Sequence, residues 1–228
     1  MTVEILIVFF VTLFVRLWST LVGGGGSIMI PMLLFMGLPP SQAIATNRFS
    51  GASNMLTIIK FNQLGLVKWK LGLFLAIFSG IGAGIGGFFV LTLDNAIMEK
   101  GIGVILILSV PMLLLKGKLG LEERNVKITR LRNAGGAVMM TILGAIGGFF
   151  SSTGVWFSYV FLYYYGLSFL QTAGTRKLSG AAIVLVSLSM FIPAGLVVWP
   201  IALSMFVGGG IGGWIGAKYS KQLGNKWI

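Results

Sequence analysis

Basic side chains inside apolar stretches are the residues of this sequence best suited to chemistry. Arg48 lies in the apolar segment 41–60, and Arg176 and Lys177 lie in the apolar segment 170–192. A cation within a membrane-spanning segment costs about 2.5–3.5 kcal/mol on insertion scales, so it normally has a partner or a role. The five acidic residues, Glu4, Asp94, Glu99, Glu122 and Glu123, all lie at ends or in loops. Because no carboxylate is placed to neutralise these cations, the pattern predicts a site for a mobile anion.

The same cations could instead serve as anchors at the membrane surface. Arg48 and Lys177 each lie about two turns into their segments, so their long side chains could snorkel to lipid headgroups. Arg16 is a third cation in an apolar segment. Hydrolysis within a membrane would need a Ser/His pair or paired carboxylates, and the chain has no His and no acidic residue within a span. We therefore expect no catalytic residues, no enzyme activity, no cofactor and no metal site.

A glycine run interrupts the first apolar stretch. Gly23 to Gly26 are followed by Ser27 and a short apolar segment, 27–37. Glycine breaks a helix and leaves backbone N–H groups uncovered at the start of the next one, where the helix dipole attracts anions. The corresponding place later in the chain holds Ser151, Ser152, Thr153 and Gly154, before the short apolar segment 154–166. The alternative is a patch of glycines that only lets helices pack closely.

Polar residues at helical spacing complete the expected site. In segment 41–60, Gln42, Thr46, Ser50 and Asn54 are four residues apart and share one helix face. We expect the substrate to be bound by residues of both halves of the chain: Gly24, Gly25, Gly26, Ser27, Gln42, Thr46, Asn47, Arg48, Ser151, Ser152, Thr153, Gln171, Thr175, Arg176 and Lys177.

The composition indicates an all-α polytopic membrane protein, because only 10% of the residues are charged, 56% are hydrophobic, and mean hydropathy is +0.96. A spanning helix needs about 20 apolar residues. The candidate spans are 3–22, 41–60, 70–93, 97–115, 133–150, 170–192 and 200–217. The net charge of +12 follows from basic residues between spans, so we expect the lipid bilayer, and no nucleic acid, as a partner.

The loop 116–132 carries six basic residues, and it predicts the orientation. Loops rich in Lys and Arg stay in the cytoplasm, and counting spans back from this loop also puts the N-terminus there. Lys218, Lys221 and Lys226, at the C-terminal end, disagree with this count because they would lie outside. We expect a multi-pass protein of the bacterial inner (plasma) membrane.

The sequence repeats itself at a spacing of 129–130 residues. Residues 37–51 align with 166–180, 65–69 with 195–199, and 80–87 with 210–217. We therefore expect a first transmembrane repeat at 1–115, the cytoplasmic loop at 116–132, and a second, incomplete repeat at 133–228. Four crossings in the first half predict repeats that run parallel, and an eighth helix is expected beyond Ile228. The small-residue faces leave a homodimer open.

These features resemble the sulfite exporter TauE/SafE family. The glycine cluster, the Pro-containing half-helix, the G-L-P-P-x-x-A-x-A-T-N sequence that starts at Gly37 and the Gly-Leu-Val-x-Trp sequence that starts at Gly65 carry the resemblance. It covers Val22 to Gly87 and, more loosely, Gly147 to Ala217. The resemblance implies an eight-helix permease of bacterial inner membranes with sulfite, sulfonates or related sulfur oxyanions as substrates. Arg16 and the Ser-Ser-Thr-Gly sequence in the second repeat depart from the usual pattern.

The expected function is therefore that of a secondary transporter, an exporter of small anions. It would work by alternating access at a midplane site between the repeats. An anion channel and a non-transporting accessory membrane protein remain the alternatives.

Overall fold

The computed structural model describes residues 2–22, 25–114, 123–124, 126–150 and 153–223, and every regular element in these ranges is helical. The first repeat region holds α1 (Thr2–Val22), α2 (Gly25–Phe35), α3 (Pro40–Gly51), α4 (Asn54–Gln63), α5 (Trp69–Thr92) and α6 (Asn95–Leu114). The second holds α7 (Arg130–Phe150), α8 (Gly154–Tyr159), the π-helical turn η1 (Val160–Tyr164), α9 (Phe169–Phe191) and α10 (Trp199–Leu223). The predicted all-α class is confirmed.

The outward faces of the long helices are apolar. On α5, Leu73, Ile77, Ile81 and Ile85 recur every four residues and are each at least half exposed. Among the described residues, α5, α7 and the Trp199–Ser220 part of α10 are long and apolar enough to cross a membrane. A stripe of this kind on a helix surface suits a lipid environment, so the chain is a membrane protein.

Two helical hairpins pack into the bundle. Helix α2 folds back along α1, because Gly25 lies against Ser19 and Thr12 Oγ1 contacts Met29 Sδ at 3.9 Å. Likewise α8 and η1 fold back along α7, with Thr153 beside Gly147 and Tyr165 beside Gly136. Each short segment therefore returns the chain toward the end where its long helix began.

The predicted span 41–60 is two helices rather than one. Helix α3 ends at Gly51 and α4 begins at Asn54. Between them the backbone N–H groups of Ala52 and Ser53 bond to carbonyls three residues back, and Ser53 Oγ donates to Ser50 O at 2.7 Å. A serine hydroxyl that binds a carbonyl of its own helix competes with the regular ladder and bends it. The corresponding stretch of α9 runs on unbroken.

Residues at corresponding positions of the two halves make corresponding contacts. Thr46 Oγ1 on α3 accepts a hydrogen bond from Val198 N, before α10, at 3.1 Å. Thr175 Oγ1 on α9 accepts one from Lys68 N, before α5, at 3.0 Å. Each threonine therefore caps the helix of the other half. The turns match as well, because Gly37 and Gly166 adopt positive φ angles of 86° and 72° after α2 and η1.

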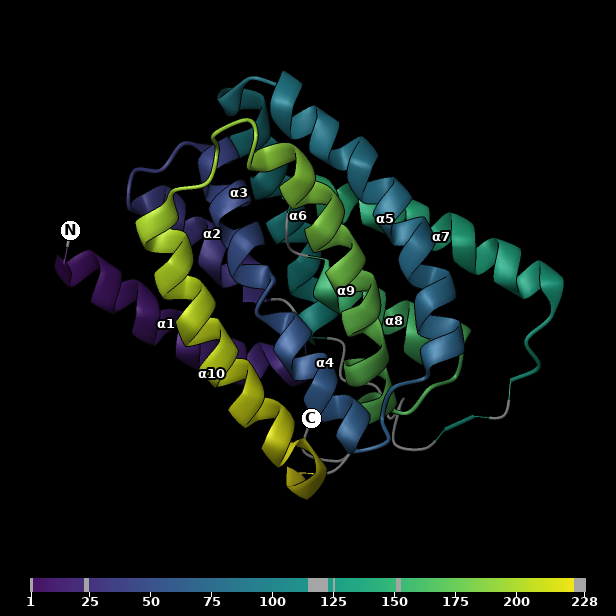
Figure 1. Cartoon of the computed structure of the whole chain (residues 1–228). Helices are drawn as coiled ribbons and strands as arrows, with labels where there is room; N and C mark the ends of the chain where they lie inside the picture. Colours follow the sequence, from purple (N-terminus) through teal and green to yellow (C-terminus); the bar gives the residue numbers. More distant parts are fainter. Residues whose placement is uncertain (1, 23–24, 115–122, 125, 151–152, 224–228) are drawn as a thin grey trace.

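Close helix crossings through glycine join the two halves. Gly208, Gly212 and Gly216 of α10 lie directly against backbone carbonyls of α1, and Gly82 and Gly86 of α5 lie against those of α7. In Figure 1 the first pair forms one side of the molecule and the second pair the other, with α9 between α10 and α5. In both pairs the contacting residue numbers rise together, so the paired helices run in the same direction.

The halves run in opposite directions, which contradicts the parallel arrangement expected from the span count. Helices α9 and α5 run together, because Gly72 contacts Thr175 and Gly87 contacts Met190; α10 runs in the same direction as α4. Helix α9 runs against α3 and α4, as the contact of Gly174 with Phe61 and of Gly51 with Val184 shows. Corresponding helices are thus antiparallel. The count failed because it did not allow α2 to return the chain to the end where α1 starts.

The start of α1 and the basic linker lie at opposite ends of the bundle, so the two cannot both be cytoplasmic as expected. At one end Ser204 Oγ donates to Ile5 O at 2.9 Å, and Ser41 N donates to Asn95 Oδ1 at 3.3 Å. At the other end the described linker residues meet the starts of α5 and α9. The end of α10 is there too, because Ala217 packs with Phe61 and Leu170.

We predict that Gly212→Val strongly destabilises the protein, because a Cβ at this position meets the backbone of Leu13 on α1. Overpacking of this kind lowers the unfolding temperature in detergent by about 5–10 °C. Gly103→Val is the matched control, since a Cβ there has no atom within 4 Å. An equal shift for both variants would show that the close α1–α10 crossing does not limit stability.

Candidate functional site

A cavity of about 110 Å³ lies between the two hairpins and helices α3, α4 and α9. A single water needs only about 10–15 Å³ of such space, so the cavity is large enough for a small polyatomic ion. Its walls combine cations, small residues and a few apolar side chains: Arg16, Ser19, Gly25, Gly26, Asn47, Arg48, Gly51, Asn54, Thr153, Gly154, Phe157, Arg176, Lys177, Gly180, Ile183 and Val184.

Both halves of the chain contribute equivalent positions to this cavity. Asn47, Arg48 and Gly51 on α3 correspond to Arg176, Lys177 and Gly180 on α9, and all six line it. The ends of the two hairpins also meet there, with Gly25 from the first and Thr153 from the second. The cavity therefore lies where the two related halves face each other.

Four cations surround the cavity, and each is buried: Arg16, Arg48, Arg176 and Lys177 expose 6–9% of their surface. Two of them bind carbonyl groups near the end of a long helix of the other half. Arg48 Nη2 donates to Gly147 O on α7. Arg176 Nη2 donates to two carbonyl oxygens on α1, Ser19 O and Thr20 O, and both of these bonds are 3.2 Å long. These carbonyls belong to helix ends that carry partial negative charge, which stabilises a nearby cation.

The remaining two cations have neutral side-chain partners. Lys177 Nζ donates to Asn54 Oδ1 at 2.7 Å, and Arg16 Nη2 donates to Ser50 Oγ at 3.4 Å. The buried Nε atoms of Arg16 and Arg48 have no hydrogen-bond acceptor among the described residues. A buried donor without an acceptor carries a desolvation cost, which a bound anion would remove.

The charge of the cavity is not balanced by the described protein. Two helix C-termini supply about half a negative charge each, against four full positive charges. None of the described residues that line the cavity is acidic. The N-terminus of α2, at Gly25, adds further positive potential. The arrangement can therefore hold a small anion, with donors that approach it from both halves.

The other residues expected in the site are either outside the described residues or lie away from the cavity. Gly24, Ser151 and Ser152 lie outside the described residues. Ser27 and Gln42 do not line the cavity, and Thr46 and Thr175 cap backbone N–H groups instead. Gln171 lies at the linker end. Arg16, Asn54 and Gly180 line the cavity without having been assigned to the site, although Arg16 and Asn54 were visible as polar residues in apolar segments.

A family model described as "Sulfite exporter TauE/SafE" matches residues 8–228. The chain belongs to this family. The resemblance noted from the sequence is therefore confirmed, and no solved structure matches the chain significantly.

Curated relatives of this TauE/SafE protein carry transporter names. A probable membrane transporter protein of Haemophilus influenzae (strain ATCC 51907 / DSM 11121 / KW20 / Rd) is 28% identical over 202 residues, which cover 88% of this chain and 78% of that protein. The probable membrane transporter protein YfcA of Escherichia coli (strain K12) is 28% identical over 230 residues, 97% of this chain and 82% of that protein. ORF9 of Sinorhizobium sp, with the same description, is 26% identical over 213 residues, 92% of this chain and 80% of that protein. The chain is a membrane transporter of the TauE/SafE type.

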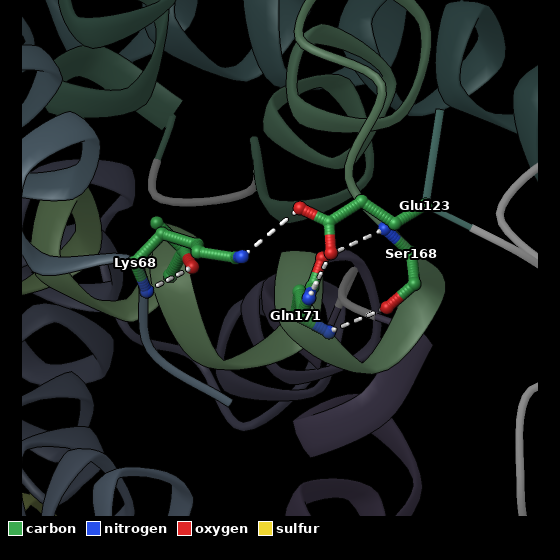
Figure 2. Close-up of polar contacts among 5 residues, drawn as sticks. Lys68, Glu123, Ser168 and Gln171 are labelled. Atoms are coloured by element: carbon green, nitrogen blue, oxygen red, sulfur yellow. Dashed lines mark hydrogen bonds and ion pairs between the residues drawn. The ribbon is translucent and has the colours of Figure 1, made fainter. Parts of the chain in front are cut away.

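Gln171 takes part in a polar network at the linker end of this TauE/SafE protein. Figure 2 shows Glu123 between Lys68 and Gln171. Its carboxylate pairs with Lys68 Nζ at 2.9 Å and accepts a hydrogen bond from Gln171 Nε2 at 2.7 Å. Gln171 also forms a capping box with Ser168 at the start of α9. The linker, the start of α5 and the start of α9 are thereby connected.

Acidification is expected to weaken this network. The Gln171 amide and the Lys68 ammonium hold the pKa of the Glu123 carboxyl below its ordinary value. The stabilisation is therefore complete above the ordinary carboxyl pKa of about 4.3 and is lost as pH falls through the lowered value. Because both side chains are nearly half exposed, we predict that Glu123→Gln lowers the unfolding temperature at pH 7 by only about 1–2 °C.

Thermal unfolding of both proteins as a function of pH tests this prediction. The difference between wild type and Glu123→Gln should shrink as the pH falls below about 4.3. Glu99→Gln, at the opposite end of the bundle, is the control. A difference that persists unchanged into acid would mean that the Glu123 charge does not stabilise the fold.

Proposed function

We propose that this protein is a secondary transporter that exports small anions, with sulfite, sulfonates or related sulfur oxyanions as the substrate class. The main support is the set of four buried cations around one cavity whose described lining contains no carboxylate. An oxyanion offers several acceptor oxygens to converging donors, and Arg and Lys donors to an anion form strong, charge-assisted hydrogen bonds. The family description, which names sulfite, agrees with this substrate class.

Transport proceeds by alternating access. The anion binds among Lys177, Arg48 and Arg16, and the two halves then tilt around it so that the cavity opens to one side at a time. The antiparallel halves support this mechanism. If the two halves exchanged conformations, a state open to one side of the membrane would become a state open to the other side. The Glu123 network joins three segments at one end and would have to separate or move as a unit when that end opens.

The orientation that we propose puts the linker end in the cytoplasm and the start of α1 outside, in a bacterial inner membrane. Most described basic residues outside the cavity lie at the linker end: Lys60, Lys68, Lys70, Arg124, Lys127, Arg130, Arg132 and Lys218. Glu4, Asp94 and Glu99 lie at the other end, with Lys100. Cytoplasmic ends carry the excess of Lys and Arg. This orientation also removes the conflict that the basic end of α10 caused in the span count.

We predict that Lys177→Gln weakens anion binding while leaving the fold intact, because Gln can still donate to Asn54 but carries no charge. The KM for sulfite in proteoliposomes should rise by about tenfold to a hundredfold, the size of one hydrogen bond between charged groups. Lys127→Gln, which removes an exposed linker charge, is the control. Equal effects of the two substitutions would remove Lys177 from the site and favour a general surface-charge effect.

Gly180→Leu should block the cavity without disturbing the bundle. Gly180 lines the cavity, and a Cβ there has no atom within 4 Å, so a larger side chain has room to enter the space that the anion would occupy. We predict flux below about a tenth of wild type at normal unfolding temperature, whereas Gly103→Leu keeps normal flux. Full flux through Gly180→Leu would contradict an anion path through this cavity.

The same liposomes separate a carrier from a channel. The sulfite flux through a carrier is saturable, and it rises when an unlike anion such as sulfoacetate is present on the opposite side of the membrane. A channel shows neither property and conducts far faster. Absence of flux for sulfite, sulfoacetate, thiosulfate, sulfate and chloride, with folded protein, would favour an accessory role without transport.

A further inference from the structure

A second and larger cavity lies at the linker end, separate from the cation-lined cavity. It is about 890 Å³ in volume and forms between the start of α5, the described linker residues and the segment that follows η1. Apolar side chains, among them Leu71, Phe74 and Ile128, form much of its wall. The expected anion site does not include it, and the Lys68–Glu123 pair is the part of its lining that enters the proposed transport mechanism.

Tyr165 and Asn133 form part of the wall, but not through their polar atoms. The Tyr165 hydroxyl and Asn133 Oδ1 are buried within the protein, and the hydroxyl packs against Gly136 on α7. The groups that the cavity offers to a polar ligand are therefore its basic side chains.

The electrostatic character of the cavity is positive. Lys70 and Arg124 line it, and the Lys68–Glu123 ion pair beside them is nearly neutral as a unit. Arg124 is anchored, because its Nη2 donates to Leu162 O at 2.9 Å and to Tyr163 O at 3.0 Å. Lys70 has no hydrogen bond or ion pair with any described residue and can turn toward a ligand. The cavity therefore favours an anionic headgroup.

The depth of the cavity matches the boundary between headgroups and acyl chains. Trp69 and the flanking Lys68 and Lys70 begin α5, and the lipid-facing stripe of α5 starts at Leu73. Tryptophan and lysine concentrate at the membrane–water interface. Basic groups thus lie at the headgroup level, and Leu71 and Phe74 lie just inside the apolar layer.

We propose that this cavity binds one anionic phospholipid. Its phosphate would accept a hydrogen bond from Lys70, near Arg124, and its acyl chain would lie along Leu71 and Phe74. A free oxyanion fits less well, because it would leave the apolar wall and most of the volume unfilled. The bound lipid would join the linker to the start of α5, beside the Lys68–Glu123 pair. This proposal does not depend on which anion is transported.

Native mass spectrometry of the purified full chain in detergent tests the proposal. Phosphatidylglycerol and phosphatidylcholine with the same acyl chains are titrated separately. We expect roughly tenfold tighter binding of phosphatidylglycerol, since each basic residue at the interface contributes several-fold. Lys70→Gln should weaken phosphatidylglycerol binding about fivefold.

Two controls make the outcome specific. Lys127→Gln removes a linker charge outside the cavity, and Lys177→Gln removes one at the proposed transport site; both should bind the lipid like wild type. Lys70 is exposed, so Lys70→Gln should fold normally, and its unfolding temperature is measured alongside.

Three results would overturn the assignment. Equal affinity for the two lipids would exclude headgroup charge as the basis of binding. Loss of binding in Lys127→Gln as large as in Lys70→Gln would indicate general surface attraction. Displacement of the lipid by inorganic phosphate at equal concentration would show that the cavity recognises a free oxyanion and not a lipid.

Discussion

Four positive charges held in one buried cavity are the constraint on which this structure depends. Charges removed from water need compensation, and the described lining of the cavity offers no carboxylate. The protein compensates them in part with backbone. Arg48 reaches the carbonyl end of α7, and Arg176 reaches that of α1. Because each arginine belongs to one half and its carbonyl partner to the other, the cations also hold the two halves together. A bound anion would neutralise positive charge that the backbone carbonyl groups leave uncompensated.

Most helices could be predicted from the sequence, because the length of an apolar run and the position of a glycine break are local features that determine where a helix begins and ends. The relation between the halves could not. The direction of one short element, α2, decides on which side of the membrane the chain emerges after α1. Residues 27–37 would be equally apolar whether α2 continued across the membrane or, as here, folded back along α1. The expected parallel repeats and the cytoplasmic start of α1 both rested on this element. The break at Ala52 and Ser53 could not be predicted either, because it depends on one serine hydroxyl, that of Ser53, bound to a carbonyl three residues back.

For the candidate site, the sequence was informative where a residue type is costly in an apolar segment. Arg48, Arg176 and Lys177 could be selected because burying a cation needs a reason, and all three line the cavity. Gln171 and Thr175 were chosen for their repetition alone, and that signal cannot distinguish binding a substrate from capping a helix. Gly180, in contrast, could not be selected from the sequence. It contributes to the cavity because it has no side chain, and its position there follows from how α9 packs against its neighbours.

The pairing of α1 with α10 has a consequence for biosynthesis. Ile5 and Ser204 are joined by a hydrogen bond across 199 residues, so α1 meets α10, its main partner, only after the intervening helices have been synthesised. Until then the face of α1 that receives the α10 glycines has no partner within the nascent chain. Contacts between distant residues slow assembly, since the chain must close a long loop first. That face of α1 is therefore open to lipid until α10 has been synthesised.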